Sequence, residues 1–246
     1  MTTPTPLPPN ARMRWAVVER LLAGVSPATI LEVGCGQGAF GSRLAARGRY
    51  LGVEPDATSF AVAKSRIAGV GASVQNITED GLPPDARFDL VCAFEVLEHL
   101  EDDETALAAW SRRLAPGGRL MISMPAWQSR FNEWDTLVGH YRRYSPEQVD
   151  ALLRAAGLID VQVVVYGWPL GYALEGVRSR IARRRGVGGE DVAVSMEHRT
   201  AGSGRILQPR ALAGKLMQLG VLPFVALQNF RPAAGTGLVA VARQPS

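Results

Sequence analysis

The 246-residue sequence predicts an α/β fold in which a doubly wound, mostly parallel sheet is covered by helices on both faces. Apolar strand-like runs alternate with segments of helical periodicity from residue 29 to residue 166, and this order produces parallel strands joined by crossover helices. The first of these strands, residues 29–33, ends in three glycines at every second position, and a helical segment over residues 39–47 follows. A strand, a glycine-rich turn and a helix in this order are typical of the start of a nucleotide-binding unit.

The remaining elements follow from the same patterns. Runs rich in β-branched and other apolar residues predict strands over residues 29–33, 50–53, 73–77, 88–94, 119–124 and 161–166, with a seventh over residues 237–242. Helical periodicity predicts helices over residues 12–24, 39–47, 57–68, 103–114 and 145–156. The last of these begins at Ser145-Pro146, because serine caps a helix and proline suits its first position.

These elements divide the chain into four parts. Residues 1–11 are rich in proline and threonine, so we expect a disordered leader. Residues 12–166 form the cofactor-binding core. Residues 167–235 show no strand periodicity and are expected to form a helical or loop insertion that covers the binding site. Residues 236–246 hold the final strand and the tail.

Composition excludes several classes of protein. Hydrophobic residues make up 47% of the chain and charged residues 20%, as in an ordinary globular protein rather than a disordered one. No run of 18 apolar residues predicts a membrane-spanning helix, and no signal peptide opens the chain. The two cysteines, Cys35 and Cys92, lie in predicted buried elements, so no disulfide framework is indicated. We expect a cytoplasmic protein.

The glycine-rich turn distinguishes between two classes of cofactor. Dinucleotide-binding turns favour the spacing G-x-G-x-x-G, whereas this chain has Gly34, Gly36 and Gly38. Glu32 precedes the turn, and its carboxylate would repel a pyrophosphate but attract an ammonium or a sulfonium. Glu54 ends the second strand about twenty residues after Gly34, where a carboxylate can accept hydrogen bonds from both hydroxyls of a ribose.

Five segments in the right order resemble the class I S-adenosylmethionine (SAM)-dependent methyltransferases: residues 31–38, 53–54, 88–91, 95–100 and 114–118. The resemblance implies a Rossmann-like seven-stranded sheet whose last strand is antiparallel, with SAM as the cofactor. It also implies cofactor contacts from the strand ends and from the loop after the third strand. The cofactor-binding residues that we expect are Glu32, Gly34, Cys35, Gly36, Gly38, Glu54, Pro55, Thr78, Glu79, Phe94 and Glu95.

Methyl transfer from a sulfonium needs an aligned nucleophile and, for a hydroxyl or a protonated amine, a base that removes a proton. The chain has three histidines. His140 lies in an aromatic, polar segment and His99 follows the fourth strand, so both are catalytic candidates. The alternative for His99 is a helix-start residue bonded to the backbone, and His198 is interpreted as structural or as an acceptor contact.

Four residues of the sequence are candidate ligands of a divalent metal ion. Glu95, Glu98 and His99, together with the later His140, resemble the metal ligands of small-RNA 2′-hydroxyl methyltransferases and of some quinone-pathway O-methyltransferases. Two carboxylates and two imidazoles suit an ion that lowers the pKa of an acceptor hydroxyl. The same Glu-x-x-Glu-His pattern also occurs in metal-free relatives.

The segment over residues 125–145 is rich in aromatic side chains and is interpreted as the wall of the acceptor site. Its arginines could bind an acidic acceptor through charge-assisted hydrogen bonds, or they could form an exposed basic turn. The substrate-binding residues that we expect are Trp127, Trp134, Tyr141, Arg142 and Arg143.

The net charge of +4 is concentrated in residues 168–232, which contain ten Lys or Arg and four Asp or Glu. Apolar residues 168–174 precede five arginines, and residues 222–225 are again apolar, as in segments that lie against an anionic membrane. The alternative is that the apolar residues pack on the sheet and the arginines are solvated. The five arginines are Arg178, Arg180, Arg183, Arg184 and Arg185.

Together these observations predict SAM-dependent methyl transfer to an oxygen or nitrogen nucleophile of a small-molecule or lipid-linked acceptor. One alternative is an RNA methyltransferase, which the basic segment favours but which the lack of a recognised RNA-binding module disfavours. The other is a non-catalytic scaffold that binds SAM.

Overall fold

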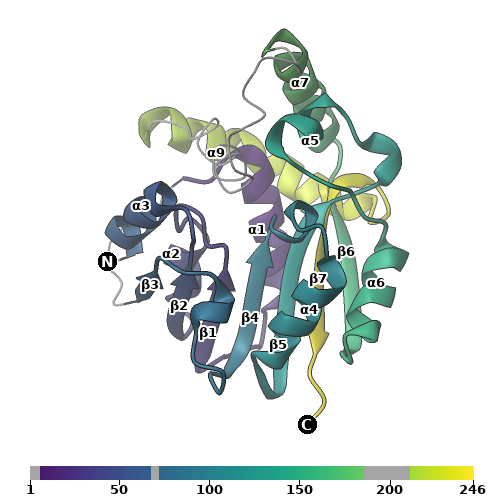
Figure 1. The fold of residues 1–246 in the computed structure, drawn as a ribbon. Helices are drawn as coiled ribbons and strands as arrows, with labels where there is room; N and C mark the ends of the chain where they lie inside the picture. Colours follow the sequence, from purple (N-terminus) through teal and green to yellow (C-terminus); the bar gives the residue numbers. More distant parts are fainter. Residues whose placement is uncertain (1–5, 68–71, 186–210) are drawn as a thin grey trace.

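A computed structural model describes residues 6–67, 72–185 and 211–246 of the chain (Figure 1). The strands are β1 (Thr29–Val33), β2 (Arg49–Val53), β3 (Ser73–Gln75), β4 (Phe88–Phe94), β5 (Leu114–Pro125), β6 (Ile159–Gly167) and β7 (Gly235–Arg243). The α-helices are α1 (Pro9–Leu21), α2 (Gly41–Leu44), α3 (Ala57–Ile67), α4 (Asp103–Arg112), α5 (Glu133–Val138), α6 (Pro146–Ala155), α7 (Leu170–Arg185) and α9 (Ala211–Leu227). Short 3₁₀ helices are η2 (Glu79–Gly81), η3 (Leu97–His99), η4 (Gln128–Arg130) and η6 (Gln228–Phe230).

The strands form one seven-stranded sheet in the order β3-β2-β1-β4-β5-β7-β6. Neighbouring strands from β3 to β5 are parallel, and β7 is antiparallel to both β5 and β6. The predicted fold class is confirmed, and the antiparallel last strand, β7, lies between β5 and β6. The order of the strands reverses between β1 and β4, and ligands of such sheets bind beyond the carboxyl ends of the strands at this point.

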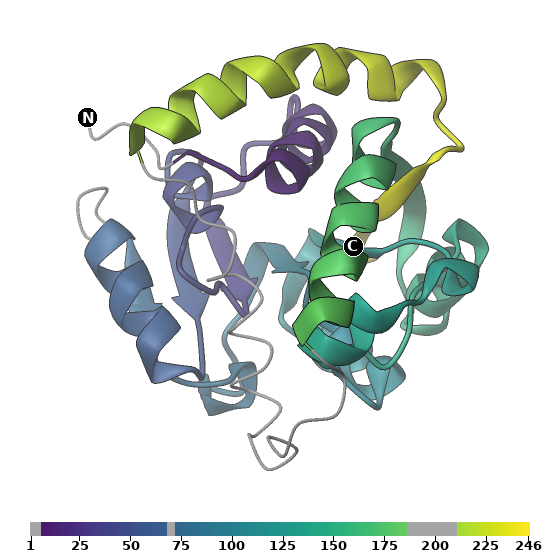
Figure 2. The same cartoon turned by 90° about the horizontal axis from the view of Figure 1, so that it is seen from above.

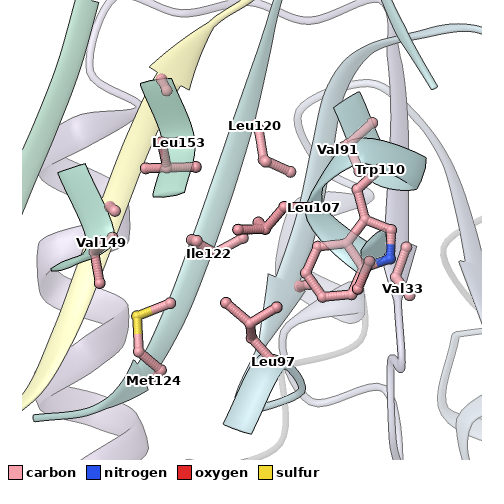
Figure 3. Packing of buried hydrophobic residues seen from close by; sticks show 14 of the residues in the cluster. Val33, Val91, Leu97, Leu107, Trp110, Leu120, Ile122, Met124, Val149 and Leu153 are labelled. Atoms are coloured by element: carbon pink, nitrogen blue, oxygen red, sulfur yellow. The ribbon is translucent and has the colours of Figure 1, made fainter. Parts of the chain in front are cut away.

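Two apolar layers hold the sheet between its helices. Successive strand residues point to opposite faces, so Ile30 belongs to the layer beneath α1, α2 and α3, and Leu31 to the layer beneath α4 and α6. Figure 3 shows the second layer, in which Trp110 and Leu107 of α4 pack against strand residues such as Ile122. The side chains of Trp110 and Leu107 are each about 1% exposed, and their burial anchors α4 to β4 and β5.

The first helix starts earlier than the sequence predicts. α1 begins at Pro9 and the side chain of Leu7 is 1% exposed, so the predicted disordered leader over residues 1–11 is too long. The proline-rich composition predicted that residues 1–11 would not be helical. Proline is nevertheless compatible with the first turn of a helix, because the backbone N–H groups there have no hydrogen-bond partner within the helix. This difference matters for function because α1 contributes to the site described below.

Two helices, α7 and α9, occupy the described part of the predicted insertion. α7 stands next to α5 beyond the carboxyl ends of the strands (Figure 1), and α9 runs along one side of the molecule, over α1 (Figure 2). The side chain of Gln228 in η6 fixes the end of α9 by hydrogen bonds to the backbone of Gly167 and of Met13. His198 lies outside the described residues.

Among the helices that the structure describes, none combines the length and the apolar character that crossing a membrane requires.

Candidate active site

A cavity of about 670 Å³ opens at the carboxyl ends of β1, β2 and β4, at the point where the strand order reverses. Its volume is in the range that holds a cofactor and a small molecule. Residues of α1, α5 and α7 also line it. The helices α5 and α7 stand beyond the carboxyl ends of the strands (Figure 1). The polar and charged side chains in its lining are Asn10, Arg14, Glu32, Gln37, Glu54, Asp56, Ser59, Glu95, His99, Glu101, Asp135, His140, Arg143, Glu175, Arg178 and Thr236.

The three glycines of the turn after β1 have different surroundings. All three adopt positive φ angles, but a Cβ atom on Gly34 would lie 2.8 Å from Val96 and one on Gly38 would lie 2.7 Å from Ile67. A Cβ atom on Gly36 would meet no protein atom within 4 Å, and Gly36 lines the cavity. Gly34 and Gly38 therefore allow close packing, whereas Gly36 leaves bare backbone for a ligand.

Glu54 connects the end of β2 to this turn. Its carboxylate accepts a hydrogen bond from the backbone N–H of Gly36 at 2.8 Å and another from that of Asp56 at 2.9 Å. The side chain is 7% exposed and faces the cavity. A carboxylate oxygen that accepts one hydrogen bond can accept a second, so Glu54 can bind a ribose while it holds the turn in place.

Glu32 lies one position before the end of β1 and is 3% exposed. Burial raises the pKa of its carboxyl group to about 8, and the nearby Glu54 adds to the effect. A hydrogen bond of 2.6 Å from the hydroxyl of Tyr50 and the charge of Arg14 act in the opposite direction. The cavity thus contains a buried carboxyl group that a cationic ligand would convert to the ionised form.

His140 is held in a defined orientation by Asp135. Its Nδ1 lies 2.8 Å from one carboxylate oxygen of Asp135, and Arg143 donates to both oxygens of the same carboxylate, at 2.9 and 2.6 Å. Burial alone would raise the pKa of Asp135, but these hydrogen bonds bring it below its ordinary value. Because the ionised carboxylate accepts the Nδ1 proton, Nε2 of His140 keeps a lone pair and can act as a base.

His99 and Glu98 lie beside His140. The imidazole rings of His99 and His140 meet edge to face with their centroids 4.6 Å apart. Burial, with His140 adding to it, lowers the pKa of His99 to about 3, so this ring is neutral. Glu98 is completely buried, and burial raises the pKa of its carboxyl group well above the ordinary value.

The same three side chains fit a divalent metal ion. One ligand atom each from Glu98, His99 and His140 lie within 4.8 Å of one another. Neither oxygen of Glu98 accepts a hydrogen bond from the described residues, and its contact with Nε2 of His140 is 3.9 Å, too long for a hydrogen bond. Glu95, the fourth group of the predicted set, instead pairs with Arg14 at 3.1 Å.

The structure brings most of the predicted site residues into this cavity. Those that line it are Glu32, Gly34, Cys35, Gly36, Glu54, Pro55, Phe94, Glu95, His99, Trp134, His140 and Arg143. Six others lie outside its lining: Gly38, Thr78, Glu79, Trp127, Tyr141 and Arg142.

These six have other contacts or face solvent. Thr78 and Glu79 begin η2, where the carbonyl of Glu79 accepts a hydrogen bond from Arg113. The indole of Trp127 donates to the carbonyl of Gly235 at 3.0 Å. Arg142 pairs with Asp103 at 3.0 Å, and its neighbour Tyr141 is 39% exposed. Of the residues predicted for the acceptor wall, Trp134 and Arg143 line the cavity.

The structure also places residues in the cavity that the sequence pattern did not indicate. Arg14 comes from α1, Asp135 from α5, and Glu175 and Arg178 from α7. For Arg14, the one signal that the sequence offered was a charged residue among the apolar residues of a predicted helix. α7 has no sequence motif, so nothing distinguished Arg178 from Arg180, Arg183 and Arg184, which are exposed.

A family profile for the methyltransferase domain matches residues 10–163, more than half of the chain. The chain belongs to the class I SAM-dependent methyltransferases. SAM is therefore its cofactor. The methyltransferase is 33% identical over 153 residues to a protein of Mycobacterium tuberculosis H37Rv named as an S-adenosylmethionine-dependent methyltransferase. That match covers 61% of this chain and 56% of the relative.

A second relative is the ubiquinone biosynthesis O-methyltransferase of Pseudomonas paraeruginosa, 32% identical over 117 residues, or 46% of this chain and 49% of the relative. The matched part spans about half the length of these relatives. Among solved structures, phosphoethanolamine N-methyltransferase 2 of Haemonchus contortus has a TM-score of 0.60 at 17% identity, covering 98% of this chain and 54% of that one. NodS from Bradyrhizobium japonicum has a TM-score of 0.57 at 20% identity, covering 96% and 87%.

Replacing Glu32 with glutamine is expected to stabilise the SAM-free methyltransferase. The folded-state pKa of about 8 lies above the ordinary value of 4.5, so the contribution of this group to stability is fully present below pH 4.5 and is lost as the pH rises towards 8. The loss reaches about 3 kcal/mol at pH 7. Glutamine keeps an acceptor for Tyr50 and does not ionise, so Glu32→Gln should gain over the wild type at pH 7 and little at pH 5.

Urea unfolding without SAM at the two pH values measures this difference, with the exposed Glu104→Gln as the control. The same Glu32→Gln variant should bind SAM more weakly, because it has no charge to pair with an ammonium. A gain in stability that is equal at both pH values would show that burial does not raise the pKa of Glu32.

Proposed function

We propose that this methyltransferase transfers the methyl group of SAM to an oxygen or nitrogen nucleophile of a small-molecule or lipid-linked acceptor. The observation that carries the proposal is that the His140–Asp135 pair lines the same cavity as Gly36 and Glu54. A base and a cofactor cradle in one enclosed space are what proton removal and in-line transfer require. The relative named as a ubiquinone biosynthesis O-methyltransferase supports a small-molecule acceptor and transfer to oxygen.

In the first mode of action, Nε2 of His140 takes the proton of the acceptor as the nucleophile attacks. Asp135 keeps the proton on Nδ1 and stabilises the imidazolium that forms. Arg143 holds Asp135 through two hydrogen bonds and so positions the base without touching the acceptor.

In the second mode, Glu98, His99 and His140 would hold a divalent ion, which would lower the pKa of an acceptor hydroxyl. The two unpartnered oxygens of Glu98 support this mode, because a buried carboxylate is costly without a cation or a hydrogen-bond donor. The two modes are exclusive for His140, since a nitrogen that binds a metal cannot take a proton.

A transfer assay with SAM labelled in its methyl group tests the proposal. Fractions of small metabolites, extracted lipids and RNA serve as separate acceptor pools, each assayed with and without a chelator. We expect label in the metabolite or lipid pool. Label in RNA alone would favour the RNA methyltransferase, and tight SAM binding without transfer to any pool would favour the scaffold. Loss of transfer with the chelator, restored by a divalent ion, would select the metal mode.

We also propose that α9 lies against an anionic membrane surface, which would bring a lipid-linked acceptor to the cavity. α9 and η6 bury Val221 and Gln228 against the protein and expose an apolar stripe at helical spacing on the other side. Exposed Arg20 and Arg231 lie at one end of the stripe, where they can meet lipid phosphates. The stripe consists of Leu219, Leu222, Pro223, Ala226, Leu227 and Phe230.

The arginines of α7 contribute less to such a surface than the sequence suggested. Arg178 lines the cavity and Arg183 pairs with Glu133 at 2.8 Å, whereas Arg180 and Arg184 are exposed. The described side chains therefore do not form one basic face. The side chain of Arg185 lies outside the described residues.

Co-sedimentation with vesicles is expected to detect the membrane contact. The wild type should bind vesicles with anionic lipid better than neutral ones, and a double variant, Leu219→Ser with Leu222→Ser, should bind about 10-fold more weakly or worse. Both leucines are exposed, at 64% and 46%, so the variant should fold normally. Val177→Ser on α7, at a site 50% exposed, is the matched control. Equal binding by both variants would exclude α9 as the contact.

A further inference from the structure

Arg178 differs from the other arginines that line the cavity in having no carboxylate partner. Arg14 pairs with Glu95 at 3.1 Å, and Arg143 pairs with Asp135 at 2.6 Å and with Glu175. Within residues 6–67, 72–185 and 211–246, no carboxylate lies within ion-pair distance of Arg178.

The contacts of Arg178 are neutral. With its amide oxygen turned towards the guanidinium, Asn10 accepts hydrogen bonds from Nη1 at 2.8 Å and from Nη2 at 3.2 Å. The indole ring of Trp134 lies below the guanidinium, 5.8 Å from ring centre to Cζ. Burial lowers the pKa of Arg178, and the charge of Glu95, which Arg14 already neutralises, offsets only part of that effect.

The two carboxylates of α5 and α7 that line the cavity, Asp135 and Glu175, are already paired with arginines. Arg130 and Arg143 share Glu175, and Arg143 also binds Asp135, so two arginines and two carboxylates neutralise one another. Arg178 adds one positive charge to the cavity wall. A half-buried guanidinium without a counterion is less favourable than a paired one, and an anion that enters the cavity with a ligand would supply the missing partner.

We propose that Arg178, with Asn10 and Trp134, forms a subsite for an anionic group of the methyl acceptor, either a carboxylate or a phosphoryl group. This inference rests on the proposed function, because it assumes that the acceptor enters this cavity. The guanidinium offers parallel N–H donors to two oxygens of the anion, and Trp134 covers its face. The helix α7 thereby selects the acceptor, although the cofactor-binding turn and the base lie on other elements.

The test compares matched anionic and neutral probes on protein saturated with S-adenosylhomocysteine, so that no turnover is needed. Benzoate and benzamide share a ring and differ in charge, and phenyl phosphate and inorganic phosphate extend the series to phosphoryl groups. In calorimetric titrations, the wild type should bind benzoate or phenyl phosphate about 10–100-fold more tightly than benzamide. Arg178→Met should abolish this preference, whereas Arg180→Met, an exposed position on the same helix, should retain it.

Three results would overturn the subsite. One is an equal preference for anions in the wild type and in Arg178→Met. Another is the absence of saturable binding of any anionic probe to the wild type at millimolar concentration. The third is weaker binding of SAM itself to Arg178→Met, which would assign the guanidinium to the carboxylate of the cofactor. Failure of the proposed function has a different signature, since methyl transfer would be missing even where these probes bind as expected.

Discussion

Replacement of His140 by alanine is expected to lower turnover by about 10²–10⁴-fold if it is the general base, and to leave SAM affinity unchanged. The imidazole lies in the part of the cavity formed by α5 and η3, and it contacts Asp135, His99 and Glu98 rather than the glycine turn. Its loss therefore removes the proposed proton acceptor without touching the residues that we propose bind the cofactor. Initial-rate kinetics measure turnover, and calorimetry measures SAM affinity.

Two further measurements distinguish a base from a structural role. Imidazole added to the buffer should restore part of the activity of His140→Ala, because the cavity then offers room for a free base. Asp135→Asn should keep the ring but lose control of its tautomer, so it should also lower turnover. If His140→Ala loses SAM binding or unfolds at a much lower temperature, the ring has a structural role. Full activity in His140→Ala would assign the base elsewhere.

The core of the site could be predicted from the sequence because its residues belong to strand ends. Glu32, Gly36 and Glu54 follow apolar runs, and parallel strands bring their carboxyl ends to one edge of the sheet. His99 and His140 were predictable from the scarcity of bases. Asp135, the partner of His140, was not predictable, because its role depends on a capping box at the start of α5 that fixes its carboxylate next to His140.

Sequence patterns do not determine whether a side chain faces the cavity when it has two plausible environments. Trp127 lies in the expected aromatic segment, but its positive φ angle and its bond to Gly235 keep it outside the cavity. Arg142 and Arg143 are neighbours in sequence and alternate in direction, so one pairs with Asp103 and the other with Asp135. Sequence alone does not fix which neighbour turns inwards. For Arg178, the decisive fact is the absence of a carboxylate partner among the described residues, which only three-dimensional contacts reveal.

Replacement of Gly36 by alanine is expected to weaken SAM binding by about 10–100-fold, since a methyl group placed against the cofactor costs about 1–3 kcal/mol. The methyl group would meet no protein atom within 4 Å, so it would project into the cavity, where the bare backbone of the turn faces the ligand. Alanine at a φ angle of +54° also strains the turn, and this strain alone could lower stability by about 1–2 kcal/mol.

Gly24→Ala separates the two effects. Gly24 has a φ angle of +76° and, like Gly36, has no atom within 4 Å of a Cβ position, but it does not line the cavity. Both variants should lose a similar amount of stability in urea unfolding without SAM, and only Gly36→Ala should lose affinity for SAM in calorimetry. Equal SAM affinity in Gly36→Ala and the wild type would exclude the turn as the cofactor cradle. Equal losses in both variants would mean that backbone strain, rather than the bare backbone of Gly36, controls binding.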